Sequence, residues 1–144
     1  MIRYNHQEDK TKEKEKKMGC FYVGFNWRRT VNGKGKIGET GGKTPANRFG
    51  EIRTKEPFDC LRYLIFENDT KAERLFIESF VRLNLERTIG YTHVENDHFE
   101  YLIEKGHRKE QAMIFANTAI DFAKQACEIT KVKYTEGTKK YKKG

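Results

Sequence analysis

The stretch Gly19-Cys-Phe-Tyr-Val-Gly24 is a short apolar run, and a second run, Gly35-Lys-Ile-Gly-Glu-Thr40, follows it after a glycine-rich basic loop. Both runs hold strand-forming residues, and Asn32-Gly33 between them is a turn signal. We therefore expect strands at residues 21–26 and 36–40 that pair as an antiparallel hairpin.

A short helix is predicted after this hairpin. Thr44 suits its N-cap and Pro45 its first position, so the helix covers residues 46–54 and carries Arg48. A tyrosine, a lysine and an arginine therefore come from one small supersecondary unit. A phenol, an ammonium and a guanidinium on one face would suit a phosphodiester.

The rest of the chain alternates further strands and helices. Residues 58–67 are rich in strand formers and predict a central strand, and Thr70 and Glu73 form a capping box. The remaining predicted elements are an apolar helix at 72–85, a loop at 88–97, a short strand at 98–103 and a long amphipathic helix at 108–131. This order predicts an α+β fold, a small mixed or antiparallel sheet flanked by helices, with a long C-terminal helix.

Composition limits the classes of protein that fit. The chain has 144 residues, enough for one domain, and its formal net charge of +8 favours an anionic partner. No apolar run reaches the roughly 20 residues that span a bilayer, and the charged N-terminus predicts no signal peptide, so we expect a cytoplasmic protein. The dispersed cysteines predict reduced core thiols: Cys20, Cys60 and Cys127.

Three regions are predicted along the chain. Residues 1–18 form a charged arm, residues 19–103 the folded core, and residues 104–144 the long helix and a basic tail. The tail mirrors the arm, and its lysines alternate with Tyr134 and Tyr141. Each terminal segment either keeps the protein soluble or contacts phosphates without sequence preference.

The order of these residues resembles the GIY-YIG nuclease superfamily. The chain matches the family's order of motifs. The first strand holds Phe21-Tyr22-Val23 and the second Lys36-Ile37-Gly38-Glu39-Thr40, and a helical arginine, a further strand and a helical glutamate come after them. The second motif is most similar to a phage-type branch that reads Lys-Ile-Gly-x-Thr. The likeness covers roughly residues 19–99 and ends at His98-Phe99.

This resemblance implies a metal-dependent phosphodiesterase site on one face of the core at residues 19–103. Tyr22 matches the tyrosine of the first motif, and Lys36 stands where the wider superfamily has a second tyrosine. Arg48 matches the family arginine and Glu78 the metal-binding glutamate. The implied cofactor is one Mg²⁺ or Mn²⁺ ion on Glu78.

Tyr22 and Arg48 also have purely structural interpretations. A strand tyrosine usually packs, and a phenol with a pKa of about 10 is a poor base unless Lys36 stabilises the phenolate. Arg48 could simply lie on a solvated helix face, and Arg53 is the less favoured substitute. His93 or His98 could carry a proton if Tyr22 does not.

Glu78 is preferred to Glu73 as the metal ligand because the capping box already explains Glu73. Glu78 lies in mid-helix among apolar residues. Its structural interpretation is an ion pair with Arg74 or Arg82, each one turn away. A single carboxylate suits Mg²⁺, which keeps several waters and takes other ligands from a substrate phosphate.

Nucleic-acid contacts are predicted on the hairpin loop and just beyond it. An aromatic and basic loop could enter a groove or stack on a base, although Trp27 could equally cap the core. The residues concerned are Trp27, Arg28, Arg29, Lys34 and Lys43.

These features predict an endonuclease in which Tyr22 activates water and Arg48 holds a phosphodiester of double-stranded DNA. One active centre cuts one strand, so duplex cleavage needs a homodimer or two encounters. The alternative is a non-catalytic DNA- or RNA-binding module on the same fold, and a third, weaker one is a phage-encoded interaction protein.

Overall fold

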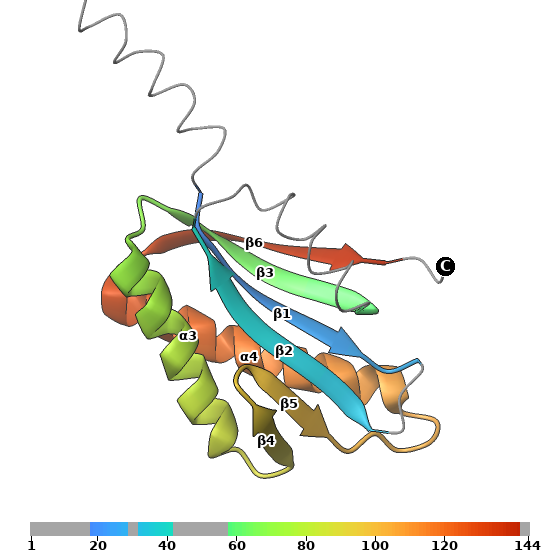
Figure 1. Ribbon diagram of the computed structural model, residues 1–144. Coiled ribbons are helices and arrows are strands. Elements are labelled where there is room, and N and C mark those ends of the chain that lie inside the picture. Colours follow the sequence, from blue (N-terminus) through green and yellow to red (C-terminus); the bar gives the residue numbers. More distant parts are fainter. Residues whose placement is uncertain (1–17, 29–31, 42–57, 142–144) are drawn as a thin grey trace, which may run out of the picture.

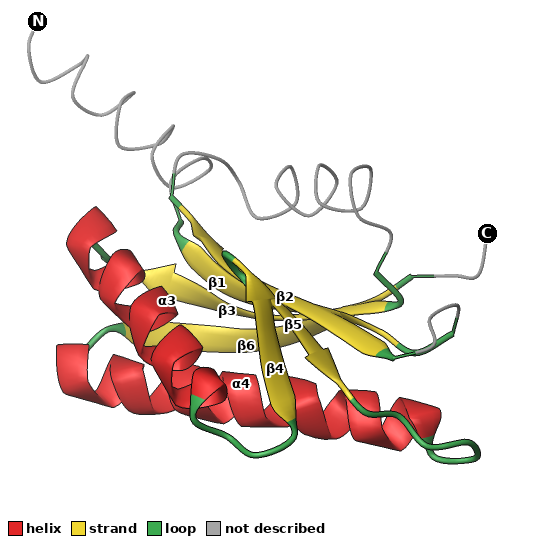
Figure 2. Ribbon diagram, turned by 60° about the horizontal axis from the view of Figure 1, so that its bottom comes forward, coloured by secondary structure: helices red, strands yellow, loops and turns green. Residues whose placement is uncertain are grey.

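A six-stranded antiparallel sheet organises the residues that the structure, a computed structural model, describes: 18–28, 32–41 and 58–141. The strand order is β4-β5-β2-β1-β3-β6. Figure 1 and Figure 2 show that helices α3 and α4 both lie on one side of this sheet. The elements are β1 (Cys20–Asn26), β2 (Gly33–Thr40), β3 (Cys60–Glu67), α3 (Lys71–Glu86), β4 (Tyr91–Glu95), β5 (His98–Tyr101), α4 (Arg108–Thr130) and β6 (Lys133–Lys140). The predicted fold class, with its long C-terminal helix, is confirmed.

The predicted hairpin is confirmed as β1 and β2, which pair antiparallel with Tyr22 opposite Gly38 and Gly24 opposite Lys36. β2 begins at Gly33, three residues before the predicted start, so the boundary at residue 36 was wrong. The glycine that looked like part of a turn, Gly35, instead leaves room in the strand for the Phe115 ring of α4.

The capping box is confirmed at the start of α3. The Thr70 N–H donates to the Glu73 carboxylate at 2.8 Å, and the Glu73 N–H donates to the Thr70 hydroxyl at 3.1 Å. Ile77, Val81 and Leu85, spaced by four residues, are fully buried against the sheet. This spacing fixes which face of α3 turns toward β1 and β2, and so where Glu78 points.

Two segments differ from the predictions. The predicted loop at 88–97 contains β4, which pairs with β5 through a turn where Asn96 has a φ of 46°. The predicted basic tail contains β6, which pairs with β3 over eight residues and leaves β3 in the interior of the sheet. Both strands lie at the edges of the sheet and are mostly exposed, so they lack the apolar alternation that marks a half-buried strand.

The two faces of the sheet bury separate clusters. Phe21, Val23 and Phe25 face α3 and α4 in the main core, whereas Cys20 and Tyr22 pack with Phe58, Leu61 and Tyr141 on the other face. Cys20, Cys60 and Cys127 are buried and form no disulfide, as predicted. No helix in the described part of the chain is long and apolar enough to cross a membrane.

Candidate functional site

Tyr22 and Lys36 come from neighbouring strands and share one face of the sheet, opposite the face that α3 and α4 cover. Residues that lie directly opposite each other in an antiparallel pair have side chains on the same face. The register therefore groups Tyr22 with Gly38, and Lys36 with Gly24 and His98. The structure thus places the two residues of the predicted hairpin site diagonally across β1 and β2 on the same face.

The Tyr22 ring lies across β2 at Gly38. A Cβ at residue 38 would overlap the Tyr22 hydroxyl and Cζ, so the close approach depends on glycine. Tyr22 is only 1% exposed and packs with Phe58 and Leu61. Its hydroxyl therefore points toward the edge of β2 from a well-packed ring.

The hairpin of β4 and β5 pairs with only the first part of this edge of β2. β5 pairs with β2 only as far as Lys36, and the Ile37 N–H then donates to the carbonyl of Asp97 at 3.0 Å. Residues 38–40 have no strand partner on this side within the described ranges. We call residues 37–40 the β2 edge.

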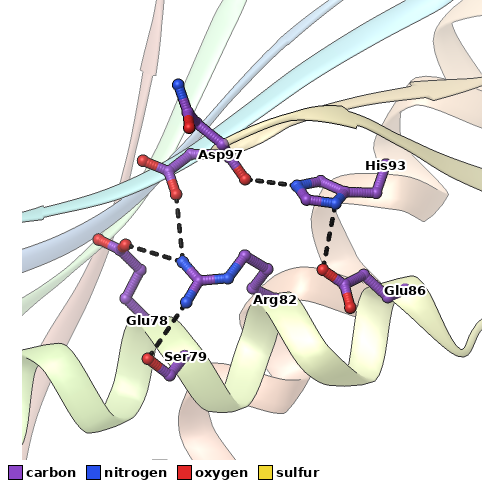
Figure 3. Close-up of polar contacts among 7 residues, drawn as sticks. Glu78, Ser79, Arg82, Glu86, His93 and Asp97 are labelled. Atoms are coloured by element: carbon purple, nitrogen blue, oxygen red, sulfur yellow. Dashed lines mark hydrogen bonds and ion pairs between the residues drawn. The ribbon is translucent and has the colours of Figure 1, made fainter.

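Glu78 approaches the β2 edge from the opposite face, on α3. Figure 3 shows the carboxylates of Glu78 and Asp97 both turned toward the guanidinium of Arg82. Arg82 Nη1 lies 3.3 Å from Glu78 Oε1 and 3.3 Å from Asp97 Oδ1. The predicted ion pair with Arg82 is present, whereas Arg74 instead pairs with Asp69 and Glu39.

The setting of Glu78 opposes its ionisation. Burial, and then the negative charges of Asp97 and Glu39, raise the pKa of Glu78 to about 7, although Arg82 acts in the other direction. A hydrogen bond with the Asp97 carboxyl also favours the protonated form. The Glu78 side chain is 16% exposed, so solvent can still reach it.

The donor set at this position fits a small, hard cation. Two carboxylates already converge on one cationic group, and oxygen ligands are those that Mg²⁺ prefers. Among the described residues no cluster of three or more His, Cys, Asp or Glu side chains is arranged to hold a metal. Any ion here would therefore take most of its ligands from water and substrate, and Arg82 would have to move aside.

Asp97 is the functional candidate that sequence reasoning missed. It lies in the predicted loop at 88–97, and the pairing of β5 with both β4 and β2 brings it to the β2 edge. The Asn96-Asp97 turn before the strand at His98 was the available signal. His93, on the same hairpin, contacts Glu86 at 3.1 Å and the carbonyl of Asn96.

The predicted nucleic-acid contacts lie partly inside the described residues. Trp27 is half-buried, while Arg28 and Lys34 are exposed at the end of β1 and the start of β2. Arg29, Lys43 and Arg48 lie outside the described residues, as do Arg53 and the predicted helix at 46–54.

No family model, no curated protein and no solved structure matches this chain.

Proposed function

We propose that this protein is a GIY-YIG-type endonuclease that hydrolyses phosphodiester bonds of DNA with one Mg²⁺ or Mn²⁺ ion. The observation that carries the proposal is the pair formed by Glu78 and Asp97 beside the β2 edge. Carboxylates held close enough to raise a pKa favour a bound cation, which would replace the shared proton.

Each residue has a defined role in this proposal. Glu78, joined by Asp97, holds the ion, which stabilises charge on the leaving oxygen when it is bound. Tyr22 accepts a proton from the attacking water, and Lys36 on the same face favours the phenolate. Arg48 grips the scissile phosphate through its guanidinium.

The β2 edge explains how groups on two faces could serve one phosphate. The Tyr22 hydroxyl reaches the edge over Gly38, and Glu78 reaches it from the face that carries Glu39. A phosphodiester lying along residues 38–40 would have the tyrosine on one side and the carboxylates on the other.

A second candidate function is non-catalytic binding of DNA or RNA, and the burial of Tyr22 favours it. A phenol that is 1% exposed in an apolar cluster is what a purely packing role requires. This module would keep the positive charge and the contacts of Trp27, Arg28 and Lys34 without cleavage.

Nicking of supercoiled plasmid in Mg²⁺ separates the two candidates. We expect Glu78→Gln and Tyr22→Phe each to lower the nicking rate by roughly 10²-fold or more, because each removes a group that acts on the reacting atoms. Tyr63→Phe is the matched control, since Tyr63 lies opposite Tyr22 on β3 and on the same face.

The outcomes are distinct. A wild-type protein that binds plasmid but never nicks it, in Mg²⁺ or Mn²⁺, supports the binding module. Equal nicking by wild type and Glu78→Gln rules out the assigned metal ligand.

The same proposal includes a cytoplasmic location and a homodimer that cuts both strands. The ratio of nicked to linear plasmid product tests the homodimer.

A further inference from the structure

We infer that one end of the sheet is an anchoring surface for a DNA strand, formed by Trp27, Arg28, Lys109, Lys139 and Lys140. We call these five residues the basic end. Figure 1 shows that β1 and β6 finish and β3 and α4 begin at this end. The inference takes its ligand from the proposed function, but it requires no cleavage.

Contacts with β1 and α4 fix the position of Trp27 at the basic end. Its ring centroid lies 5.9 Å from that of Phe25, and its carbonyl accepts a hydrogen bond from Arg108 Nε at 2.7 Å. Among the described residues, two cations lie near the ring: Arg28 Cζ at 5.2 Å and Lys109 Nζ at 5.9 Å from its centroid. The half-buried indole thus has a defined position between β1 and α4.

The end of β6 contacts the segment that carries Trp27 and Arg28. The Tyr141 carbonyl accepts from Arg28 Nη1 at 3.4 Å, and Lys139 Nζ lies 5.8 Å from the centroid of the Tyr141 ring. Asp59 accepts from the backbone N–H groups of Trp27 at 2.8 Å and Arg28 at 2.9 Å. Segments more than 100 residues apart in sequence therefore meet at this end of the sheet.

The charge at the basic end is largely uncompensated. Elsewhere the half-buried Arg62, Arg74 and Arg82 each pair with a carboxylate. In the described part of the chain Lys109, Lys139 and Lys140 make no ion pair, and Arg28 makes one long pair with Asp59 at 3.8 Å. All four cationic side chains belong to exposed residues.

Helix stability does not account for Lys109, because the first turn of a helix favours anions rather than cations. The lysines of β6 have another explanation, since charge on an edge strand discourages pairing with other chains. A polyanion with flat bases explains both sets together: phosphates neutralise the lysines, and a base or sugar contacts the indole.

Trp27 is the only tryptophan of the chain, so its fluorescence reports directly on this surface. The full-length protein is titrated in EDTA with a duplex oligonucleotide and with its single strand, over a range of NaCl concentrations. The test variant is Lys109→Gln/Lys139→Gln/Lys140→Gln. The matched control is Lys71→Gln/Lys131→Gln/Lys133→Gln, which removes the same charge from exposed positions outside the basic end.

We expect DNA to quench Trp27, and the test variant to bind about tenfold or more weakly near 0.1 M NaCl. The slope of log K against log salt is negative, and its magnitude should decrease by about 2 to 3 in the test variant, about one for each lost phosphate contact. The control should bind within about threefold of wild type. Equal weakening in both variants, or quenching by phosphatidylserine vesicles and not by DNA, would overturn the inference. Because no metal is present, binding here stands even if nicking fails.

Discussion

At residue 78, burial and two neighbouring carboxylates make the ionised side chain unfavourable in the folded protein. The pKa of Glu78 is about 7 when folded, against 4.5 for an unperturbed glutamate. Because the folded pKa is the higher one, the protonated Glu78 side chain stabilises the folded state fully below about pH 4.5. This stabilisation is lost as the pH rises through 7. The loss amounts to at most about 3 kcal/mol.

This shift predicts a pH-dependent difference between wild type and Glu78→Gln. In EDTA, the wild-type free energy of unfolding should fall relative to Glu78→Gln by about 1–3 kcal/mol between pH 4.5 and 8. Urea denaturation at a series of pH values measures the difference. Glu128→Gln, an exposed glutamate on α4, should follow wild type. Parallel curves for wild type and Glu78→Gln would show that the Glu78 carboxyl is not perturbed.

At the scale of the element, the capping box stabilises the N-terminus of α3, the helix that carries Glu78. Thr70→Ala removes the hydroxyl that accepts from the Glu73 N–H and should cost about 1 kcal/mol of stability. Thermal unfolding compares it with Thr135→Ala, an exposed position on β6 where we expect less than about 0.5 kcal/mol. Equal losses in the two variants would mean that the capping box does not support the helix.

The elements that could be predicted are those whose local and tertiary signals agree. α3 has a capping box and apolar residues spaced by four, and β1 is apolar because it is buried on both faces. β4 and β6 gave no such signal, because edge strands are stabilised by backbone pairing to a neighbour rather than by their own apolar residues. Gly33 and Gly35 looked like turn residues, although they serve to admit aromatic rings.

At the scale of the whole molecule, the candidate site could be predicted only in part. Sequence order pointed to Tyr22, Lys36 and Glu78, but it could not say that the hairpin residues and the glutamate lie on different faces of β2. Nor could it place Asp97, whose position depends on β5 pairing with β2. Tertiary pairing, not local sequence, brings these groups to the β2 edge.

The clustering of positive charge at the basic end also results from tertiary pairing. The sequence gives a net charge of +8, and it predicted Trp27 and Arg28 as contacts from one loop. The lysines that join them come from α4 and β6, which are distant in sequence and meet only in the folded sheet. Folding thus concentrates part of the net positive charge at the basic end.

Divalent-cation binding to the DNA-free protein tests the central claim that Glu78 and Asp97 form a cation site. At pH 8, Mg²⁺ at about ten times its dissociation constant should stabilise the wild-type fold by about 1.4 kcal/mol. Thermal unfolding in increasing Mg²⁺ measures this shift, with an equal ionic strength of NaCl as the blank. The account predicts that Glu78→Gln and Asp97→Asn each abolish the shift while Glu128→Gln retains it. A shift of the same size in all three variants, or none in the wild type, would contradict the account.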